Sequence, residues 1–257
     1  MLRFSANLSM LFTELPLLQR FRAAKQHGFD AVEIQFPYEL SSEQIYDALQ
    51  KHGLKLVLFN VDADTLLQGG EGLAAVPEKQ AQFKEAVSQA LEYATLLKPD
   101  VINVLPGRCF KSQRLDEYRQ TFLSNLHYAA DVFANIDVTT VFEAINSIDM
   151  PGFIIDSSEA MLSVLEELKH PHLRLQYDIY HMQRMQEDCT EFLKKHIHQI
   201  GHIQFADCPG RAQPGTGKID FAALFNLIDN LPYRGWVGAE YKPVGNSVDS
   251  FAWFKSR

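Results

Sequence analysis

The chain has 257 residues, of which 46% are hydrophobic and 22% charged, a composition typical of soluble globular proteins. Its net charge of −8 argues against binding to nucleic acid or to an anionic lipid surface, because neutralising phosphates needs clustered lysine and arginine. The length fits one (β/α)₈ barrel, which needs roughly 250 residues, or two smaller domains.

The cysteine pattern and the N-terminal sequence favour a soluble, cytoplasmic protein. Cys109, Cys189 and Cys208 form no CxxC pair, which indicates neither a disulfide framework nor a cysteine zinc site. Polar residues interrupt the apolar segment 1–16, so it lacks the continuous core of a signal peptide. We expect no membrane association, because no apolar run reaches the roughly 18 residues of a membrane span.

Short β-branched or aromatic segments alternate with longer amphipathic segments along the whole chain. The expected strands are residues 4–8, 31–34, 54–60, 101–105, 138–143, 173–178, 201–206 and 236–240. The expected helices are residues 16–27, 41–52, 77–97, 113–134, 157–168, 179–196, 221–230 and 250–255. Ser41 and Ser42 suit the start of the second helix, and Gly53 suits its end.

Strict alternation of strand and helix predicts a parallel sheet with helices outside it. Eight such units favour closure into a barrel over an open sheet, and no GxGxxG motif of a dinucleotide-binding fold follows an early strand. No linker-like composition divides the chain. We therefore predict an α/β fold consisting of a single (β/α)₈ TIM barrel over residues 1–257.

Four oxygen-bearing side chains stand at the ends of successive predicted strands: Glu143, Asp178, Gln204 and Glu240. They follow one another at intervals of 35, 26 and 36 residues, each near the length of one strand–helix unit. Reactive groups of such barrels lie at this end of the strands. Three carboxylates would repel each other without a cation, and an oxygen ligand set suits Mg²⁺ or Mn²⁺ better than Zn²⁺. The alternative is that each of the four is an ordinary polar residue at a strand end, which is a less economical interpretation for four such residues in register.

Three further residues are candidates for binding a substrate. His181 follows Asp178 by one helical turn, and it is either a substrate or metal contact or a histidine satisfied at a helix start. Arg211 and Lys242 are each either a partner for a substrate carboxylate or a plain surface charge. The opposite wall is expected to hold the side chains at the first three strand ends: Asn7, Glu33 and Asn60.

Two other patterns are interpreted as structural. Segment 215–218 (GTGK) lacks the full phosphate-binding motif and is predicted to be a turn. His196, His198 and His202 are expected at a helix end and strand start on the far face of the barrel, where cations complement the helix terminus.

Several segments together resemble the hydroxypyruvate isomerase family, which is part of the xylose-isomerase-like TIM-barrel group and includes 2-oxo-tetronate isomerases. They are SANLSMLFTELP, GFDAVEIQFPY, YDIYHMQ, HIQFADCPGR, PGTGKIDF and GAEYKP, spread over residues 4–253. The resemblance implies a divalent metal, Mg²⁺ or Mn²⁺, bound by the four strand-end residues, with Glu143 and Glu240 as the catalytic acid/base pair. Related epimerases of that group carry a histidine where Gln204 stands.

The implied enzyme is an intramolecular oxidoreductase of carbohydrate metabolism that acts on a small hydroxy-oxo acid. It would convert hydroxypyruvate to tartronate semialdehyde through an enediolate, or isomerise the four-carbon 2-oxo-tetronate; pocket size decides between them. A sugar-acid epimerase or a dehydratase (a lyase) on the same barrel is the alternative. A nuclease would need a histidine-rich, multi-zinc mouth and a basic rim, and a non-catalytic sensor would not need the carboxylate set. Association into a homo-oligomer is left open.

Overall fold

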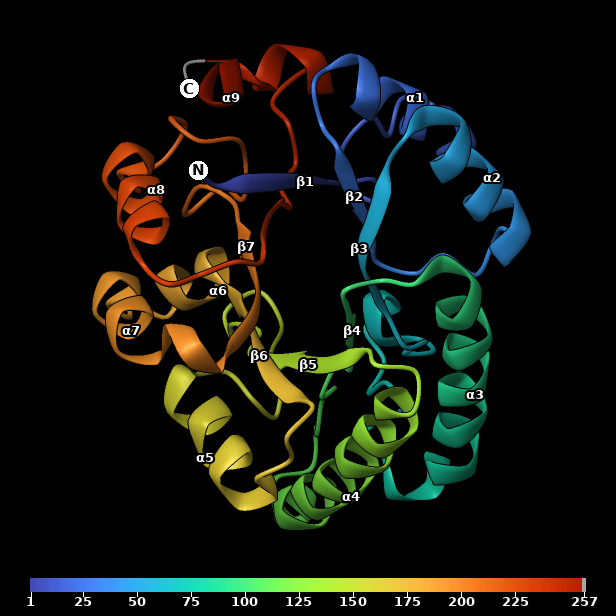
Figure 1. Ribbon diagram of the computed structural model, residues 1–257. Helices are drawn as coiled ribbons and strands as arrows, with labels where there is room; N and C mark the ends of the chain where they lie inside the picture. Colours follow the sequence, from blue (N-terminus) through green and yellow to red (C-terminus); the bar gives the residue numbers. More distant parts are fainter. Residues whose placement is uncertain (256–257) are drawn as a thin grey trace.

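Eight parallel strands close into a barrel in the computed structural model, which describes residues 1–255 (Figure 1). The strands are β1 Arg3–Asn7, β2 Ala31–Ile34, β3 Lys55–Asn60, β4 Val101–Asn103, β5 Thr139–Glu143, β6 Leu173–Asp178, β7 Ile200–Phe205 and β8 Trp236–Ala239. Each strand pairs with its neighbour in chain order, and β8 pairs with β1 to close the ring. The predicted (β/α)₈ TIM barrel is confirmed.

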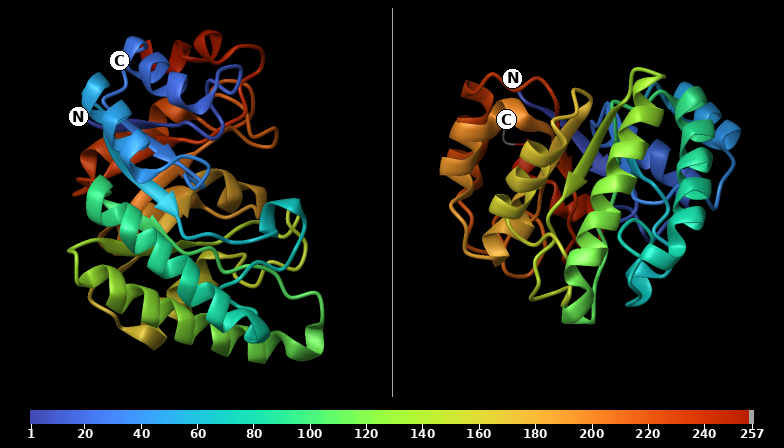
Figure 2. Two further views of the ribbon diagram at one scale, coloured as in Figure 1. Left: turned by 90° about the vertical axis from the view of Figure 1, so that its right-hand side faces the viewer. Right: turned by 90° about the horizontal axis from the view of Figure 1, so that it is seen from below.

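The helices form an outer ring around the strands, seen along the barrel in Figure 1 and from two other sides in Figure 2. They are α1 Leu17–Gln26, α2 Ser42–His52, α3 Gln80–Leu97, α4 Leu115–Ala134, α5 Ser158–Leu168, α6 Ile179–Arg184, α7 Cys189–His196, α8 Phe221–Asn230 and α9 Ala252–Lys255. Short 3₁₀ turns are η1 Leu66–Gln68, η2 Pro77–Lys79, η3 Ser112–Arg114, η4 Ile197–Gln199 and η5 Ser247–Ser250. Among these described helices none is long and apolar enough to cross a bilayer. The prediction of one domain for residues 1–257 extends over two residues, 256 and 257, that lie outside the described part.

Local sequence signals account for where α2 begins and ends. The Ser41 side chain accepts a hydrogen bond from the backbone amide of Gln44, whose side chain accepts one from the Ser41 amide, which together form a capping box. Gly53 ends the helix with φ of 58°, in the left-handed region that glycine adopts without a steric penalty. Both boundaries agree with the prediction.

The single helix predicted for residues 179–196 is wrong, because the chain forms two helices, α6 and α7. Gln186, between them, has φ of 63°, a left-handed conformation that cannot continue a right-handed helix. The Asp188 side chain then accepts from the backbone amide of Glu191 and starts α7 as a new helix. The break keeps α6 short and near the end of β6.

An aromatic cluster joins α8, α9 and the barrel near the β1–β8 junction. Phe4 on β1 packs edge-on against Phe225 at 5.1 Å and against Trp253 at 5.2 Å between ring centroids. Phe205 on β7 meets both of the same rings, at 5.1 and 5.0 Å. Aromatic pairs in these geometries stabilise a core beyond their buried area, so the C-terminal turn is held where the ring of strands closes.

The barrel interior changes from apolar to polar along the strands. An apolar cluster contains residues near the strand starts, and polar side chains follow two positions later, as in Val101 then Asn103 and Val141 then Glu143. Side chains two residues apart lie on the same face of a strand. Inward-facing positions therefore run from an apolar plug to a polar layer and end at the predicted site.

His202 belongs to this polar layer, so the prediction that it lies on the far face of the barrel is wrong. It is 1% exposed on β7, and its Nε2 lies 2.7 Å from Oε2 of Glu33 on β2. The physical reason is strand alternation, which places residue 202 on the same inward face as Gln204. His196 lies at the end of α7 as expected, with Nδ1 2.8 Å from Oε1 of Gln199.

Candidate active site

Three buried carboxylates gather at one end of the barrel. Glu143 ends β5, Asp178 ends β6 and Glu240 directly follows β8, and none of them is more than 5% exposed. Potential ligand atoms of Glu143, Asp178 and His181 all lie within 4.8 Å of one another. Nη2 of Arg211 joins Glu240 to this group, because it lies 2.8 Å from Glu240 Oε2 and 3.8 Å from Asp178 Oδ2.

Gln204, the fourth predicted ligand, is connected to the carboxylates through a buried glutamine. Nε2 of Gln176 donates to Oε1 of Gln204 at 2.7 Å and to Oε1 of Glu143 at 3.0 Å. Asn103 on β4 also donates to Glu143 Oε1, at 2.7 Å. The three acids thus lie at one barrel end, whereas Gln204 reaches Glu143 only through Gln176; that the four residues share one ion stays a prediction.

Burial and the charges of neighbouring carboxylates raise the pKa values of all three acids. The pKa of Glu143 is well above its usual value, first through burial and then through the charges of Glu240 and Asp178. Burial raises the pKa of Asp178 to about 7, although Arg211 lowers it. Burial also raises the pKa of Glu240 against the opposing effect of Arg211. A single arginine does not offset three desolvated carboxylates.

The donor set fits a divalent cation. Oδ1 of Asp178 accepts from the backbone amide of Tyr180 at 2.8 Å, whereas the buried Oδ2 has no hydrogen-bond partner among the described residues. Buried polar atoms normally have hydrogen-bond partners, and a buried carboxylate oxygen without one, beside two further acids and 3.8 Å from a single guanidinium, is costly. A divalent cation would satisfy it, and a set rich in oxygen suits Mg²⁺ or Mn²⁺.

The hydrogen bonds of His181 fix which ring nitrogen carries the proton. Its Nδ1 faces the Asn146 side-chain nitrogen at 2.7 Å and the Asn146 backbone amide at 3.4 Å. A backbone N–H can only donate, so Nδ1 accepts and the hydrogen resides on Nε2, 3.5 Å from Asp178 Oδ2. Burial lowers the pKa of His181 well below its usual value and keeps the ring neutral. His181 therefore presents an N–H to the site.

Asn146 is itself held in this orientation, a contribution that sequence analysis missed. Its Oδ1 accepts from the backbone amide of Asp149 at 2.8 Å, and its Nδ2 donates to Asp149 Oδ2 at 3.1 Å. Asp149 also accepts from the Tyr180 hydroxyl and from Arg184. The position of Asn146, three residues beyond a strand-end carboxylate, was the available signal.

Arg211 lies in the loop between β7 and α8, and that loop is held by one buried acid. Asp207 accepts from the backbone amides of three residues of the loop, Gly215, Gly217 and Ile219. The guanidinium lies 5.2 Å from the centre of the Tyr180 ring. Segment 215–218 is thus a loop organised around an aspartate, as the prediction of a turn implied.

Lys242 is placed less centrally than predicted. Its backbone amide donates to the carbonyl oxygen of Arg211 at 2.8 Å, but its side chain is exposed rather than buried with the carboxylates. Gln35, which the sequence analysis did not single out, contributes instead, because its Nε2 donates to Glu240 Oε1 at 2.9 Å. Gln35 directly follows β2, the same strand-end position that identified the acids.

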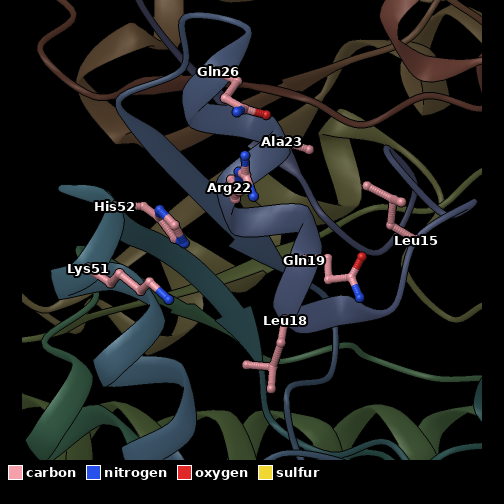
Figure 3. Close-up of a pocket in the computed structure, with 8 residues that line it drawn as sticks. All are labelled: Leu15, Leu18, Gln19, Arg22, Ala23, Gln26, Lys51 and His52. Atoms are coloured by element: carbon pink, nitrogen blue, oxygen red, sulfur yellow. The ribbon is translucent and has the colours of Figure 1, made fainter.

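A separate groove runs between α1 and α2 (Figure 3). It is lined by Leu15, Leu18, Gln19, Arg22, Ala23, Gln26, Lys51 and His52. None of these lining residues is a carboxylate, so the groove lacks the anionic oxygen ligands of the barrel end. The chemistry is concentrated at the strand ends.

Comparison with known proteins gives full-length similarities. Residues 21–257 match the family described as xylose isomerase-like TIM barrel. The hydroxypyruvate isomerase of Escherichia coli (strain K12) is 39% identical over 253 residues, covering 98% of each chain. A 2-oxo-tetronate isomerase of Cupriavidus necator is 38% identical, covering 98% of this chain and 97% of its own. A crystal structure described as AP endonuclease, family 2, from Brucella melitensis superposes with a TM-score of 0.95 at 35% identity, covering 100% of this chain and 99% of that one.

Proposed function

This chain belongs to the hydroxypyruvate isomerase family of xylose isomerase-like TIM barrels, and on that premise we propose that it isomerises a small hydroxy-oxo acid. The substrate is hydroxypyruvate, which gives tartronate semialdehyde, or the four-carbon 2-oxo-tetronate. The observation that supports this best is the group of three buried carboxylates with one guanidinium and one imidazole N–H at the same barrel end. These are the groups that proton transfer beside a carbonyl requires.

We assign Glu143, Asp178, Gln204 and Glu240 as the residues that hold a divalent cation, Mg²⁺ or Mn²⁺. When bound, the cation supplies polarisation of the substrate carbonyl and stabilises negative charge on the neighbouring oxygens. This assignment is supported by Oδ2 of Asp178, which lacks a hydrogen-bond partner within residues 1–255, and by the raised pKa values of the acids.

Glu143 and Glu240 form the acid/base pair. One carboxylate removes a proton from C3 of hydroxypyruvate, and the C–H electron pair becomes the C2–C3 double bond of an enediolate. The other glutamate delivers a proton to C2, while the hydroxyl proton leaves O3 and O2 is protonated, so that the aldehyde lies at C3. General acid/base catalysis contributes about 10²–10⁴-fold in such steps.

His181 and Arg211 orient the substrate. The N–H on Nε2 of His181 donates to a substrate oxygen. Arg211 uses Nη2 for Glu240, and its buried Nε has no partner among the described residues, which leaves it free to donate to the substrate carboxylate. Lys242 remains a second predicted partner for that carboxylate.

The test is product formation from hydroxypyruvate and from 2-oxo-tetronate in D₂O. From at least one acid we expect an isomer that differs from the substrate only in its bonding and in deuterium at the new C–H position. We expect no turnover by Glu143→Gln or Glu240→Gln. Glu39→Gln, at an exposed glutamate, is the matched control and should remain fully active. Wild-type turnover retained by either site variant would refute the acid/base pair.

The same experiment separates the alternatives. A dehydratase would release a product lighter by one water, and an epimerase would invert C3 of 2-oxo-tetronate but form no new compound from hydroxypyruvate, which has no stereocentre. A nuclease is addressed with DNA that carries an abasic site, and we expect no cleavage because the chain has a net charge of −8. Cytoplasmic location and homo-oligomer formation remain predictions.

A further inference from the structure

A further buried carboxylate, Glu33 on β2, lies beside the proposed site without joining the three acids. It is fully buried, and each of its oxygens has two hydrogen-bonding neighbours. Oε1 accepts from Asn7 at 3.1 Å and from Gln204 at 2.8 Å. Oε2 accepts from Ser5 at 3.1 Å and lies 2.7 Å from Nε2 of His202. Glu33 is thus an acceptor hub inside the barrel.

The barrel leaves space for this hub at a glycine. A Cβ atom on Gly238 would lie 2.4 Å from Oε2 and 2.6 Å from Oε1 of Glu33, closer than real Cβ contacts. Gly238 is on β8, two residues before Glu240, and therefore on the same inward face. Any other residue there would displace the Glu33 carboxylate.

The contact with Glu33 determines how the Gln204 amide is oriented. An ionised carboxylate only accepts hydrogen bonds, so Gln204 must direct its NH₂ group to Glu33 and its oxygen the other way. That oxygen accepts from Gln176, whose NH₂ group also donates to Glu143. The donor-to-acceptor direction is therefore set continuously from Glu33 to Glu143.

A second branch runs from Glu33 to Glu240. Nδ2 of Asn7 donates to Glu33 Oε1 and, at 3.0 Å, to Glu240 Oε1. Oδ1 of Asn7 accepts from the backbone amide of Ser9 at 3.0 Å, which fixes the orientation of the Asn7 amide. Glu33 is thereby connected to two of the four proposed cation ligands. It binds Gln204 directly through a hydrogen bond, and it is linked to Glu240 through the side-chain amide of Asn7.

We infer that Glu33 is a positioning residue that turns the oxygen of Gln204 toward Gln176, and so toward the proposed cation ligand Glu143, and that through Asn7 it holds the Glu240 carboxylate. This inference rests on the proposed function insofar as Gln204 is a cation ligand. Residues that orient metal ligands typically contribute 10–100-fold to metal affinity. Glu33 is 0% exposed and acts through its neighbours rather than on substrate.

The structure predicts different outcomes for two substitutions of Glu33. Glu33→Met removes the acceptor for the Gln204 NH₂ group, so the Gln204 amide is held in its orientation by the Gln176 contact alone. Glu33→Gln keeps an oxygen for Gln204 and Asn7 if its NH₂ group faces Ser5 and His202. His202 can accept from that NH₂ group by moving its ring proton to Nδ1, which has no partner among the described residues.

The experiment is a calorimetric Mn²⁺ titration of the metal-free full-length chain. We expect Glu33→Met to weaken binding by about 10–100-fold and Glu33→Gln to remain within about threefold of wild type. Ser5→Ala, which removes one donor to Glu33 without touching the Gln204 or Asn7 contacts, is the matched control and should also remain within about threefold. Gly238→Ala keeps the negative charge of Glu33 but displaces its carboxylate, so it should weaken Mn²⁺ binding as Glu33→Met does. If Glu33→Met does not fold, Gly238→Ala tests the inference in its place.

A second readout needs no metal. In ¹⁵N NMR spectra of the metal-free protein, His202 should carry its ring proton on Nε2 in wild type and on Nδ1 in Glu33→Gln. The side-chain amide protons of Gln204 should exchange with solvent at least about tenfold faster in Glu33→Met or Gly238→Ala than in wild type. If wild type binds no Mn²⁺, the cation assignment fails, and these two measurements alone decide the role of Glu33. Wild-type Mn²⁺ affinity in folded Glu33→Met, or unchanged Gln204 exchange in it, would overturn the inference.

Discussion

Replacing Asp178 by asparagine is expected to stabilise the cation-free protein while removing the stabilisation that Mn²⁺ provides. The asparagine side chain would keep an oxygen for the backbone amide of Tyr180, which now donates to Oδ1 of Asp178. It would replace the buried Oδ2, which has no hydrogen-bond partner among the described residues and lies 3.8 Å from Nη2 of Arg211, by an uncharged NH₂ group, and so remove one of the three repelling charges. A residue that exists only for folding would give the opposite result, because its loss would destabilise the chain.

The size of the effect follows from the pKa of Asp178, which burial raises from 3.8 to about 7. Between those two pH values the folded chain holds more protons than the unfolded chain. Folding stability therefore falls as pH rises through this window, and the loss is complete above about pH 7. At 1.36 kcal/mol per pKa unit, the ionised Asp178 costs on the order of 4 kcal/mol at pH 8.

This free energy converts into a measurable change in melting temperature. A chain of 257 residues has an unfolding entropy of about 0.5 kcal/mol/K, so 4 kcal/mol corresponds to about 8 °C. Mn²⁺ at one hundred times its Kd stabilises the wild type by about 2.7 kcal/mol, or about 5 °C. The cation-free variant should thus melt above the cation-free wild type at pH 8, with no further rise when Mn²⁺ is added.

The assay is scanning calorimetry at pH 5 and pH 8, with EDTA or with saturating Mn²⁺. At pH 5 wild-type Asp178 is largely protonated in the folded state, so the gap between the two proteins should narrow. Asp47→Asn, at an exposed position on α2, controls for the loss of one negative charge and should leave both values unchanged. A cation-free Asp178→Asn protein that melts below wild type at pH 8, or that gains the same 5 °C from Mn²⁺, would refute the reasoning.

Three further predictions concern the site and the fold. Asn146→Ala frees the tautomer of His181 and should lower kcat/KM at least about tenfold without a change in circular dichroism; unchanged kinetics would contradict the role of the Nε2 proton. Gly107→Ala should lower the free energy of unfolding in urea by about 2 kcal/mol or more, because φ is 91° and the new Cβ would lie 2.4 Å from the Glu71 carbonyl oxygen. Neutral surface substitutions change this free energy by up to about 0.5 kcal/mol, so a change within that range would argue against backbone strain at Gly107. Phe205→Ala should destabilise by about 3–5 kcal/mol, a loss of about 6–10 °C, and a change below about 1 kcal/mol would mean that the aromatic cluster repacks around it.

The sequence predicts the barrel and its strand ends well because both depend on local periodicity. Hydrophobic segments of strand length recur between helical segments, so seven of the eight strand ends, including those at Glu143, Asp178 and Glu240, are located to within a residue. The fourth strand ends at Asn103, two residues before its expected end. The same reasoning does not predict the break between α6 and α7. That break depends on the left-handed backbone conformation of one residue, Gln186, which a periodic hydrophobic pattern does not predict.

Partners across the barrel are harder to predict than positions along a strand. Glu33 and His202 are 169 residues apart in sequence, and their contact depends on the ring being closed with β2 and β7 facing each other through its interior. His202 follows His196 and His198 closely in the sequence, and grouping the three histidines at a helix end leads to the wrong prediction that His202 lies on the far face of the barrel. The better signal is strand alternation, because residue 202 lies two positions before Gln204 and therefore on the same inward face of β7.

Alternation within a strand also explains why the site lies on a polar layer rather than directly on the apolar plug. Along β8 the inward positions are Trp236, then Gly238, and then Glu240 just beyond the strand end, so an aromatic plug, a space without a side chain and an acid follow in order. The space is filled by Glu33 from β2, which binds the amides that hold the acids. A carboxylate placed directly on an apolar plug would lack these donors, and its desolvation would be uncompensated. Side-chain amides below the acids fix the directions of Glu143 and Glu240, and the backbone amide of Tyr180 holds Asp178, so that three carboxylates are buried at one barrel end.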